Sequence, residues 1–222
     1  MTQRASNIQH ASSELIDLIV IGGGITGAGI AFTAAKKGWK TAIIDKEDFA
    51  FGTSSRSAKM IHGGLRYLQN LQVKLVKEAL HEREHLLKQY PHLVKPQPFF
   101  MPVYKSALSK IKLGIGLSGY DYLTGGSSMP KHKEISTNEI KERFPQLKAN
   151  AIKGGFIYYD AKTNDARLTN EVVQDAAELG TIVLNYFELK EFHTAHSNIN
   201  EITCTDKLSG TTHHLKSKVI VI

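Results

Sequence analysis

Residues 17–31 read DLIVIGGGITGAGIA, in which an apolar run from Leu18 to Ile21 leads directly into Gly22, Gly24 and Gly27. The first glycine allows a tight turn at the end of a buried strand. The second leaves the backbone open to a pyrophosphate, and the third lets the next helix pack close to the strand. The free N–H groups at the helix N-terminus favour an anion. The stretch therefore predicts a dinucleotide site.

The residues that follow agree with this prediction. Small residues from Ala28 to Ala35 favour a helix, and Gly38 is placed to end it. A second strand, 40–44, leads into Asp45, whose carboxylate is spaced to accept hydrogen bonds from a ribose. The uncharged run 18–35 also raises the alternative of a transmembrane helix, but its five glycines disfavour that interpretation.

Composition narrows the class of protein. The chain has 222 residues, 41% hydrophobic and 22% charged, which is typical of a soluble globular protein. Cys204 is the single cysteine, which excludes an internal disulfide and a thiolate metal cluster. The segment 81–85 matches HExxH, yet this pattern is short enough to arise by chance, so we expect no metal.

The net charge of +7 leaves three kinds of anionic partner open: a substrate, a membrane surface or a nucleic acid. The stretch from Lys105 to Leu123 combines lysines with apolar residues, which is typical of a membrane-surface segment. Within it, residues 111–117 alternate as a strand would, so its secondary structure stays open. No nucleic-acid-binding motif is present in the sequence, and we expect no nucleic-acid partner.

A second motif lies in the loop after Asp45. Residues 51–68 read FGTSSRSAKMIHGGLRYL. Hydroxyl groups at this density can hold a phosphate, and adjacent glycines permit close approach of the backbone to a flat ring. Arg66 offers a planar fork for a phosphate or carboxylate. An ordinary solvated loop is the alternative for the Ser/Thr cluster taken alone.

Three segments together resemble one family. GGGITGAGIA (22–31), TSSRSAKMIHGGLRYL (53–68) and DARL (165–168) are similar to the FAD-dependent aerobic glycerol-3-phosphate dehydrogenases, within the D-amino-acid-oxidase-like flavoprotein superfamily. The resemblance extends from about Asp17 to the last residue. The related glycerol-3-phosphate oxidases share much of the second segment, so the electron acceptor stays open between membrane quinone and oxygen.

The resemblance implies a set of site residues. FAD would be held at its pyrophosphate by Gly22, Gly24 and Gly27 and at its ribose by Asp45, where many members carry glutamate. The residues expected along the flavin side are Thr53, Ser54, Ser55, Lys59, His62 and Gly63. The residues expected to reach the substrate are Arg66 and Tyr67.

The implied reaction is oxidation of sn-glycerol 3-phosphate to dihydroxyacetone phosphate, with the C2 hydride passing to flavin N5. His62 is the candidate base, and a histidine that only hydrogen-bonds the flavin or backbone is the alternative. Arg66 is the candidate phosphate ligand, with an ordinary ion pair as its alternative. His62, Arg66 and Tyr67 form the candidate catalytic set.

The expected partners are glycerol 3-phosphate, membrane quinone and an anionic membrane surface. The expected location is the cytoplasm, peripheral on the inner membrane face, and a homodimer stays open. A non-catalytic flavin- or nucleotide-binding module and a basic membrane- or nucleic-acid-binding protein are the competing functions.

The expected fold class is α/β: a Rossmann-type FAD-binding domain of the glutathione-reductase kind, interrupted by an α+β substrate portion and truncated at its C-terminus. Residues 1–16 are expected as a flexible leader. Residues 17–90 and 150–222 are expected to be mainly FAD-binding, and 91–149 to form the insertion. Because the chain stops within an apolar run, 218–222, we expect a fragment that is inactive alone.

The remaining pattern predicts helices over 70–89 and 166–179 and a capped short helix after Ser136. It also predicts strands over 99–104, 155–159, 181–187 and 188–194, and a hairpin of 201–206 with 211–216.

Overall fold

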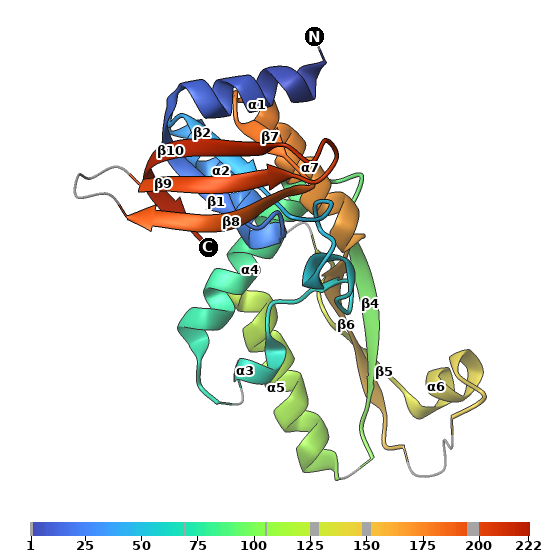
Figure 1. Cartoon of the computed structure of the whole chain (residues 1–222). Coiled ribbons are helices and arrows are strands. Elements are labelled where there is room, and N and C mark those ends of the chain that lie inside the picture. Colours follow the sequence, from blue (N-terminus) through green and yellow to red (C-terminus); the bar gives the residue numbers. More distant parts are fainter. Residues whose placement is uncertain (1, 69, 105, 125–128, 148–151, 195–199) are drawn as a thin grey trace. The chain divides into compact units, whose positions relative to one another are not determined.

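A computed structural model describes the chain except residues 1, 69, 105, 125–128, 148–151 and 195–199. It divides into two units: unit 1 comprises Met1–Ala58 and Asn164–Ile222, and unit 2 comprises Lys59–Thr163 (Figure 1). The expected interruption of the Rossmann-type domain is therefore present, but it spans 59–163 rather than 91–149. Unit 2 begins well before residue 91 because the strand Met60–Ile61 (β3) pairs with residues 161–162, which also belong to unit 2.

Unit 1 is built on a six-stranded sheet in the order β7-β2-β1-β10-β9-β8. Leu15–Ile21 (β1) lies between Thr41–Ile44 (β2) and Thr212–Val221 (β10) and is parallel to both. Ile182–Leu184 (β7) extends the parallel part beside β2. These bounds confirm the predicted β–α–β unit and show that the apolar run at 218–222 pairs directly with β1.

The other half of this sheet, formed by the last three strands, is antiparallel. Phe187–Thr194 (β8), Asn200–Asp206 (β9) and β10 follow one another as neighbours, which confirms the predicted hairpin. The predicted strand over 181–187 is shorter than expected, because Tyr186 takes a positive φ of 50° and separates β7 from β8.

The helices of unit 1 are Gln3–Ser13 (α1), Ile25–Lys36 (α2) and Asp165–Glu178 (α7), with a 3-10 turn at Thr53–Ser55 (η1). Helix α2 packs against α7. The expected flexible leader at 1–16 is wrong, since α1 places Ala11 in the core and Arg4 forms an ion pair with Asp206. The weak amphipathicity of α1 hid this helix from pattern reading.

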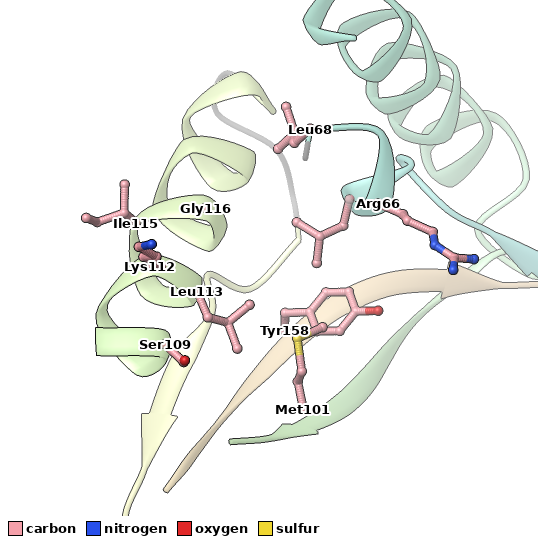
Figure 2. Close-up of a pocket in the computed structure, with 10 residues that line it drawn as sticks. Arg66, Leu68, Met101, Ser109, Lys112, Leu113, Ile115, Gly116 and Tyr158 are labelled. Atoms are coloured by element: carbon pink, nitrogen blue, oxygen red, sulfur yellow. The ribbon is translucent and has the colours of Figure 1, made fainter. Parts of the chain in front are cut away.

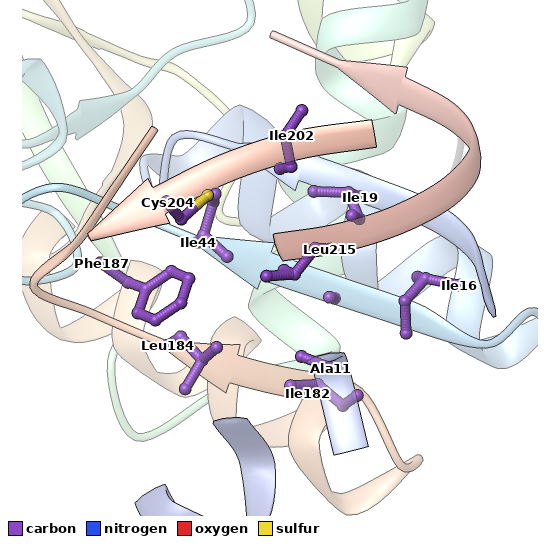
Figure 3. Close-up of a cluster of buried hydrophobic side chains, with 11 residues drawn as sticks. Ala11, Ile16, Ile19, Ile44, Ile182, Leu184, Phe187, Ile202, Cys204 and Leu215 are labelled. Carbon is purple, nitrogen blue, oxygen red and sulfur yellow. The ribbon is translucent and has the colours of Figure 1, made fainter. Parts of the chain in front are cut away.

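Eleven buried side chains of unit 1 form one apolar cluster that joins β1, β2 and β7 to the antiparallel strands (Figure 3). They are Ala11, Ile16, Ile19, Ala42, Ile44, Ile182, Leu184, Phe187, Ile202, Cys204 and Leu215. Burial raises the pKa of the Cys204 thiol to about 12, so this cysteine is a core residue, as the sequence suggested.

Unit 2 contains a sheet in the order β3-β6-β4, with a further strand, Lys133–Ile135 (β5), paired to β6. Gly155–Lys162 (β6) is central, and Lys95–Pro102 (β4) is longer than the predicted 99–104. Prolines at 96, 98 and 102 fit β4 because it is an edge strand, and their even spacing places the missing N–H groups on one side.

The helices of unit 2 are Leu65–Leu68 (α3), Val73–Gln89 (α4), Ala107–Leu123 (α5) and Thr137–Arg143 (α6). Ser136 and Glu139 form the predicted capping box of α6. The strand-like alternation over 111–117 is misleading, because this stretch lies inside α5 and Ser106 caps the helix N-terminus.

Candidate functional site

The β1–α2 turn has the geometry that the three-glycine motif predicts. Gly22 has a φ of 111°, a conformation that side-chain-bearing residues rarely adopt, and its N–H donates to the Ile44 carbonyl at 2.8 Å. A Cβ on Gly27 would lie 1.9 Å from the Gly22 carbonyl oxygen, so only glycine allows α2 to approach the turn this closely. Gly24 is the N-cap of α2 and provides no side-chain cap. Gly24 therefore places no side chain of its own over the helix N-terminus, which suits the approach of an anion.

Asp45 lies beside this turn, at the end of β2. One carboxylate oxygen accepts the Gly23 N–H at 2.6 Å, and the other accepts the Glu47 N–H at 2.8 Å. Asp45 therefore holds the turn as well as offering an acceptor. Since each carboxylate oxygen has two lone pairs, hydrogen bonds from a ribose remain compatible with both contacts.

The hydroxyl-rich loop also reaches the glycine turn within unit 1. Ser54 Oγ accepts the N–H of Ile25, in the first turn of α2, at 2.9 Å. Ser55 Oγ instead donates to the carbonyls of Phe51 and Gly52, so it stabilises the loop itself. Asp165 holds the end of the loop, accepting the Ser57 N–H at 3.1 Å and its hydroxyl at 2.7 Å.

The structure thus brings together in unit 1 seven of the predicted cofactor residues: Gly22, Gly24, Gly27, Asp45, Thr53, Ser54 and Ser55. The other members of the predicted set belong to unit 2: Lys59, His62, Gly63, Arg66 and Tyr67. Each group is described within its own unit.

In unit 2, the segment around His62 leaves the sheet directly after β3. His62, Arg66 and Tyr67 are exposed, whereas Gly63 and Gly64 are buried. Gly64 has a φ of 75°, and its carbonyl accepts the Tyr67 N–H at 2.7 Å to begin α3. Along the chain, His62 therefore precedes the two buried glycines and Arg66 follows them in α3.

A buried polar cluster lies beneath these glycines, and sequence reasoning missed it. Oδ1 of Asp160, on β6, accepts from Arg83 Nη1 at 2.5 Å and from the Tyr120 hydroxyl at 2.8 Å. The same oxygen accepts the Gly63 N–H at 3.1 Å. We call Arg83, Tyr120 and Asp160 the buried triad; each is at most 2% exposed.

Within the buried triad, the Tyr120 hydroxyl keeps its proton. Burial and the neighbouring Asp160 carboxylate raise the pKa of the Tyr120 hydroxyl far above its usual value. Tyr120 therefore remains a donor to Asp160. One sequence signal was available: Arg83 occupies the same α4 face as Val76, Leu80 and Leu87, where an apolar residue is expected.

A groove of about 790 Å³ lies in unit 2 between α3, α5 and the strands β4 and β6 (Figure 2). Its walls are mainly apolar, and Met101, Leu113 and Tyr158 face one another across it. Arg66 and Lys112 line opposite sides of the groove in Figure 2. We therefore treat Arg66 by itself as the candidate phosphate ligand.

Helix α5 also exposes several large apolar side chains next to its lysines. Leu108, Ile111, Ile115 and Tyr122 are each more than half exposed. Among the residues that the structure describes, no helix combines the length and apolar character needed to cross a membrane. Over the same residues, no group of three or more His, Cys, Asp or Glu side chains is arranged to hold a metal ion.

Comparison with known proteins gives one consistent family. The model of the family "FAD dependent oxidoreductase" matches residues 17–222. The chain is 41% identical over 207 residues to an aerobic glycerol-3-phosphate dehydrogenase of Staphylococcus epidermidis and 40% identical to one of Staphylococcus aureus. Each match covers 92% of this chain and 37% of the relative, so the chain spans little more than a third of the length of these relatives.

Solved structures agree with the fold. The glycerol-3-phosphate dehydrogenase from Bacillus halodurans complexed with FAD aligns with a TM-score of 0.74 and 30% identity, over 98% of this chain and 36% of that one. The L-alpha-glycerophosphate oxidase from Mycoplasma pneumoniae aligns with a TM-score of 0.70 and 15% identity over 93% of this chain and 53% of that one, which shows the fold alone. On the family match and the glycine turn together, the chain belongs to the FAD dependent oxidoreductase family.

Proposed function

We propose that the natural protein containing this chain oxidises sn-glycerol 3-phosphate to dihydroxyacetone phosphate with FAD as its cofactor, in glycerol catabolism. The observation that carries this proposal is the β1–α2 turn with Asp45, in a chain of the FAD dependent oxidoreductase family. Substrate identity is supported by relatives named glycerol-3-phosphate dehydrogenase at 40–41% identity.

The residues of unit 1 fit FAD. Gly24 places no side chain over the N-terminus of α2, which suits a pyrophosphate, and Asp45 supplies carboxylate oxygens for the adenosine ribose. Thr53, Ser54 and Ser55 add hydroxyls beside the same turn, with Ser54 already bonded to Ile25. FAD, when bound, supplies the hydride acceptor at N5.

His62 and Arg66 are the residues of this chain that we assign to the substrate. The His62 imidazole is exposed and takes the proton of the C2 hydroxyl as the hydride leaves C2. The Arg66 guanidinium binds the substrate phosphate through two N–H groups, with Tyr67 beside it. Lys59 and Gly63 lie along the flavin side in this proposal.

Membrane quinone is the electron acceptor that we propose. The apolar groove beside α5 suits a lipid-soluble acceptor, and the same helix carries exposed Ile111, Ile115 and Tyr122 together with Lys110 and Lys112. Apolar side chains flanked by lysines favour peripheral binding to an anionic surface. The proposed location is the inner face of the cell membrane.

The test is the visible absorbance spectrum of the natural protein before and after glycerol 3-phosphate is added without oxygen. We expect a flavin spectrum that bleaches on addition of the substrate. A protein that stays colourless with added FAD would contradict the cofactor and favour a module without flavin chemistry. A flavin that is not bleached would contradict the substrate.

Acceptor choice needs a second assay with the same protein. We expect reduction of a soluble quinone analogue to exceed peroxide formation at equal substrate. Rapid peroxide formation with negligible quinone reduction would identify an oxidase instead. Binding to anionic but not neutral vesicles, lost at high salt, would support the membrane surface.

A further inference from the structure

We infer that the buried triad of Arg83, Tyr120 and Asp160 is a positioning device for the His62–Gly63 peptide. This inference rests on the function proposed above, since it assigns the triad to the loop that carries the candidate base. No part of the proposed reaction uses these three side chains directly.

The first step of the argument is the hydrogen bond between Asp160 and the loop. Asp160 Oδ1 accepts the Gly63 N–H at 3.1 Å. In a trans peptide the N–H and the preceding C=O point in opposite directions. The bond to Asp160 therefore directs the His62 carbonyl away from the buried carboxylate and sets the orientation of the whole peptide plane.

The second step is the close packing of Gly63. A Cβ on Gly63 would lie 2.1 Å from Leu80 Cδ2 and 2.3 Å from the Tyr120 hydroxyl oxygen. The loop backbone thus rests directly on α4 and on the triad. A shift of the peptide toward the interior is blocked, and a shift outward breaks the bond to Asp160.

The third step is the cost of building the triad. Arg83 and Asp160 are almost completely buried, and removing two charges from water is expensive unless they are paired and further hydrogen-bonded. An apolar pair of similar volume would serve stability as well or better. The triad provides what such a pair lacks, a fixed acceptor for one particular backbone N–H.

The test compares two double variants in the natural protein. Arg83→Met/Asp160→Asn removes the ion pair and keeps a side-chain oxygen for Gly63, whereas Arg83→Met/Asp160→Leu keeps the branched shape of the side chain but replaces the Asp160 acceptor by methyl groups. Tyr90→Phe is the control, because it removes another buried tyrosine hydroxyl of unit 2, one that accepts from Gln89.

Two readouts separate positioning from stability. The first is hydrogen exchange of the peptide covering 61–68, which needs no activity. The second is the rate of flavin bleaching at saturating glycerol 3-phosphate in single-turnover experiments, with FAD fully bound. We expect the Leu double variant to exchange faster and to be reduced about tenfold more slowly than the Asn double variant. Tyr90→Phe should match the wild type.

Equal reduction rates in the two double variants would overturn the inference, even if exchange differed. If the Leu variant does not fold, Tyr120→Phe decides, because it removes one donor to Asp160 and keeps the ring. We expect its reduction rate to fall about threefold, and an unchanged rate would overturn the inference. Failure of the proposed function has a separate signature, a wild-type flavin that glycerol 3-phosphate does not bleach.

Discussion

Units 1 and 2 differ in the buried interactions that hold them together. In unit 1, eleven buried apolar side chains form one cluster across a regular sheet, and the candidate site is made of backbone at the end of β1. In unit 2, the apolar clusters that we describe are smaller, such as the one around Val76, Leu80 and Tyr120. There a buried ion pair joins α4 to β6.

This difference shows which hydrogen bonds hold the backbone in place at each candidate site. The glycine turn follows directly from a sheet strand, and its Gly22 N–H bonds to the Ile44 carbonyl of the neighbouring strand. Asp45 and Ser54 therefore only add side-chain acceptors to a backbone that is already held. A loop that leaves a short strand, such as the one at His62, has no ladder to hold it. There the Asp160 carboxylate provides a side-chain acceptor for the Gly63 N–H.

Removing one partner of the buried ion pair tests this difference most strongly. Arg83→Ala leaves Asp160 in the interior without its ion-pair partner, so we expect the free energy of unfolding to fall by about 3–5 kcal/mol. Urea denaturation of the natural protein measures it. The matched variant is Lys74→Ala on the same helix, whose exposed pair with Glu78 should contribute less than about 0.5 kcal/mol. Equal losses in the two variants would contradict the assigned role of the pair.

Two glycines of α2 test how far unit 1 depends on backbone packing. Gly27→Ala places a methyl group against the Gly22 carbonyl oxygen, and we expect a loss of about 1–3 kcal/mol together with weaker FAD binding. Gly29→Ala meets no atom within 4 Å and should stabilise the helix by up to about 1 kcal/mol. Thermal unfolding and FAD titration check both variants, and similar behaviour of the two would contradict the close approach.

Capping residues should behave alike in the two units. Ser54→Ala removes the acceptor for the Ile25 N–H in unit 1, and Ser136→Ala removes the cap of α6 in unit 2. We expect each to cost about 1 kcal/mol in urea denaturation, because a lost helix cap is a local effect. Only Ser54→Ala should also weaken FAD binding. If Ser136→Ala weakened FAD binding equally, the assignment of Ser54 would fail.

The ion pair between Arg4 and Asp206 in unit 1 gives the smallest expected effect on stability, and this effect depends on pH. Burial raises the pKa of Asp206, but hydrogen bonds from Arg4, Ser209 and the Leu208 N–H outweigh it and hold the pKa below its usual value. A lowered folded-state pKa stabilises the protein above the unfolded-state value of about 3.9, and this stabilisation is lost as the pH falls through the folded-state pKa.

We therefore expect Arg4→Met to reduce this stabilisation and to move the midpoint of acid unfolding to higher pH. Circular dichroism during acid titration measures the midpoint. Lys190→Met, which removes an exposed pair with Glu188, is the control and should leave the midpoint close to that of the wild type. An unmoved midpoint in Arg4→Met would contradict the contribution of this pair.

Local patterns predicted much of the fold. The β1–α2–β2 unit, the capping box at Ser136 and the hairpin of β9 and β10 follow from motifs whose partners lie within a few tens of residues. Pattern reading left α5 open, because residues 111–117 alternate as a strand would inside a helix, and it missed α1, whose amphipathicity is weak. In both elements, tertiary contacts outweigh the local pattern.

The candidate site shows the same limit. The glycine turn and Asp45 could be named from the sequence, since each belongs to a motif with a chemical reason for its spacing, and the resemblance implied the residues of the HGGLRY segment, 62–67. The bond from Ser57 to Asp165 joins residues 108 positions apart, and no local pattern indicates it.

The sequence by itself determined the fold class, because strand–glycine–helix chemistry is encoded within about thirty residues, and the resemblance over 22–31, 53–68 and 165–168 implied the family and the candidate residues. Only the tertiary structure decided what holds the His62–Gly63 peptide. Arg83, Tyr120 and Asp160 come from α4, α5 and β6, and the charges of Arg83 and Asp160 are acceptable in the interior only when they pair with each other and bond to the neutral Tyr120 hydroxyl. Such a meeting depends on the packing of three separate elements, which periodicity and motif spacing do not record.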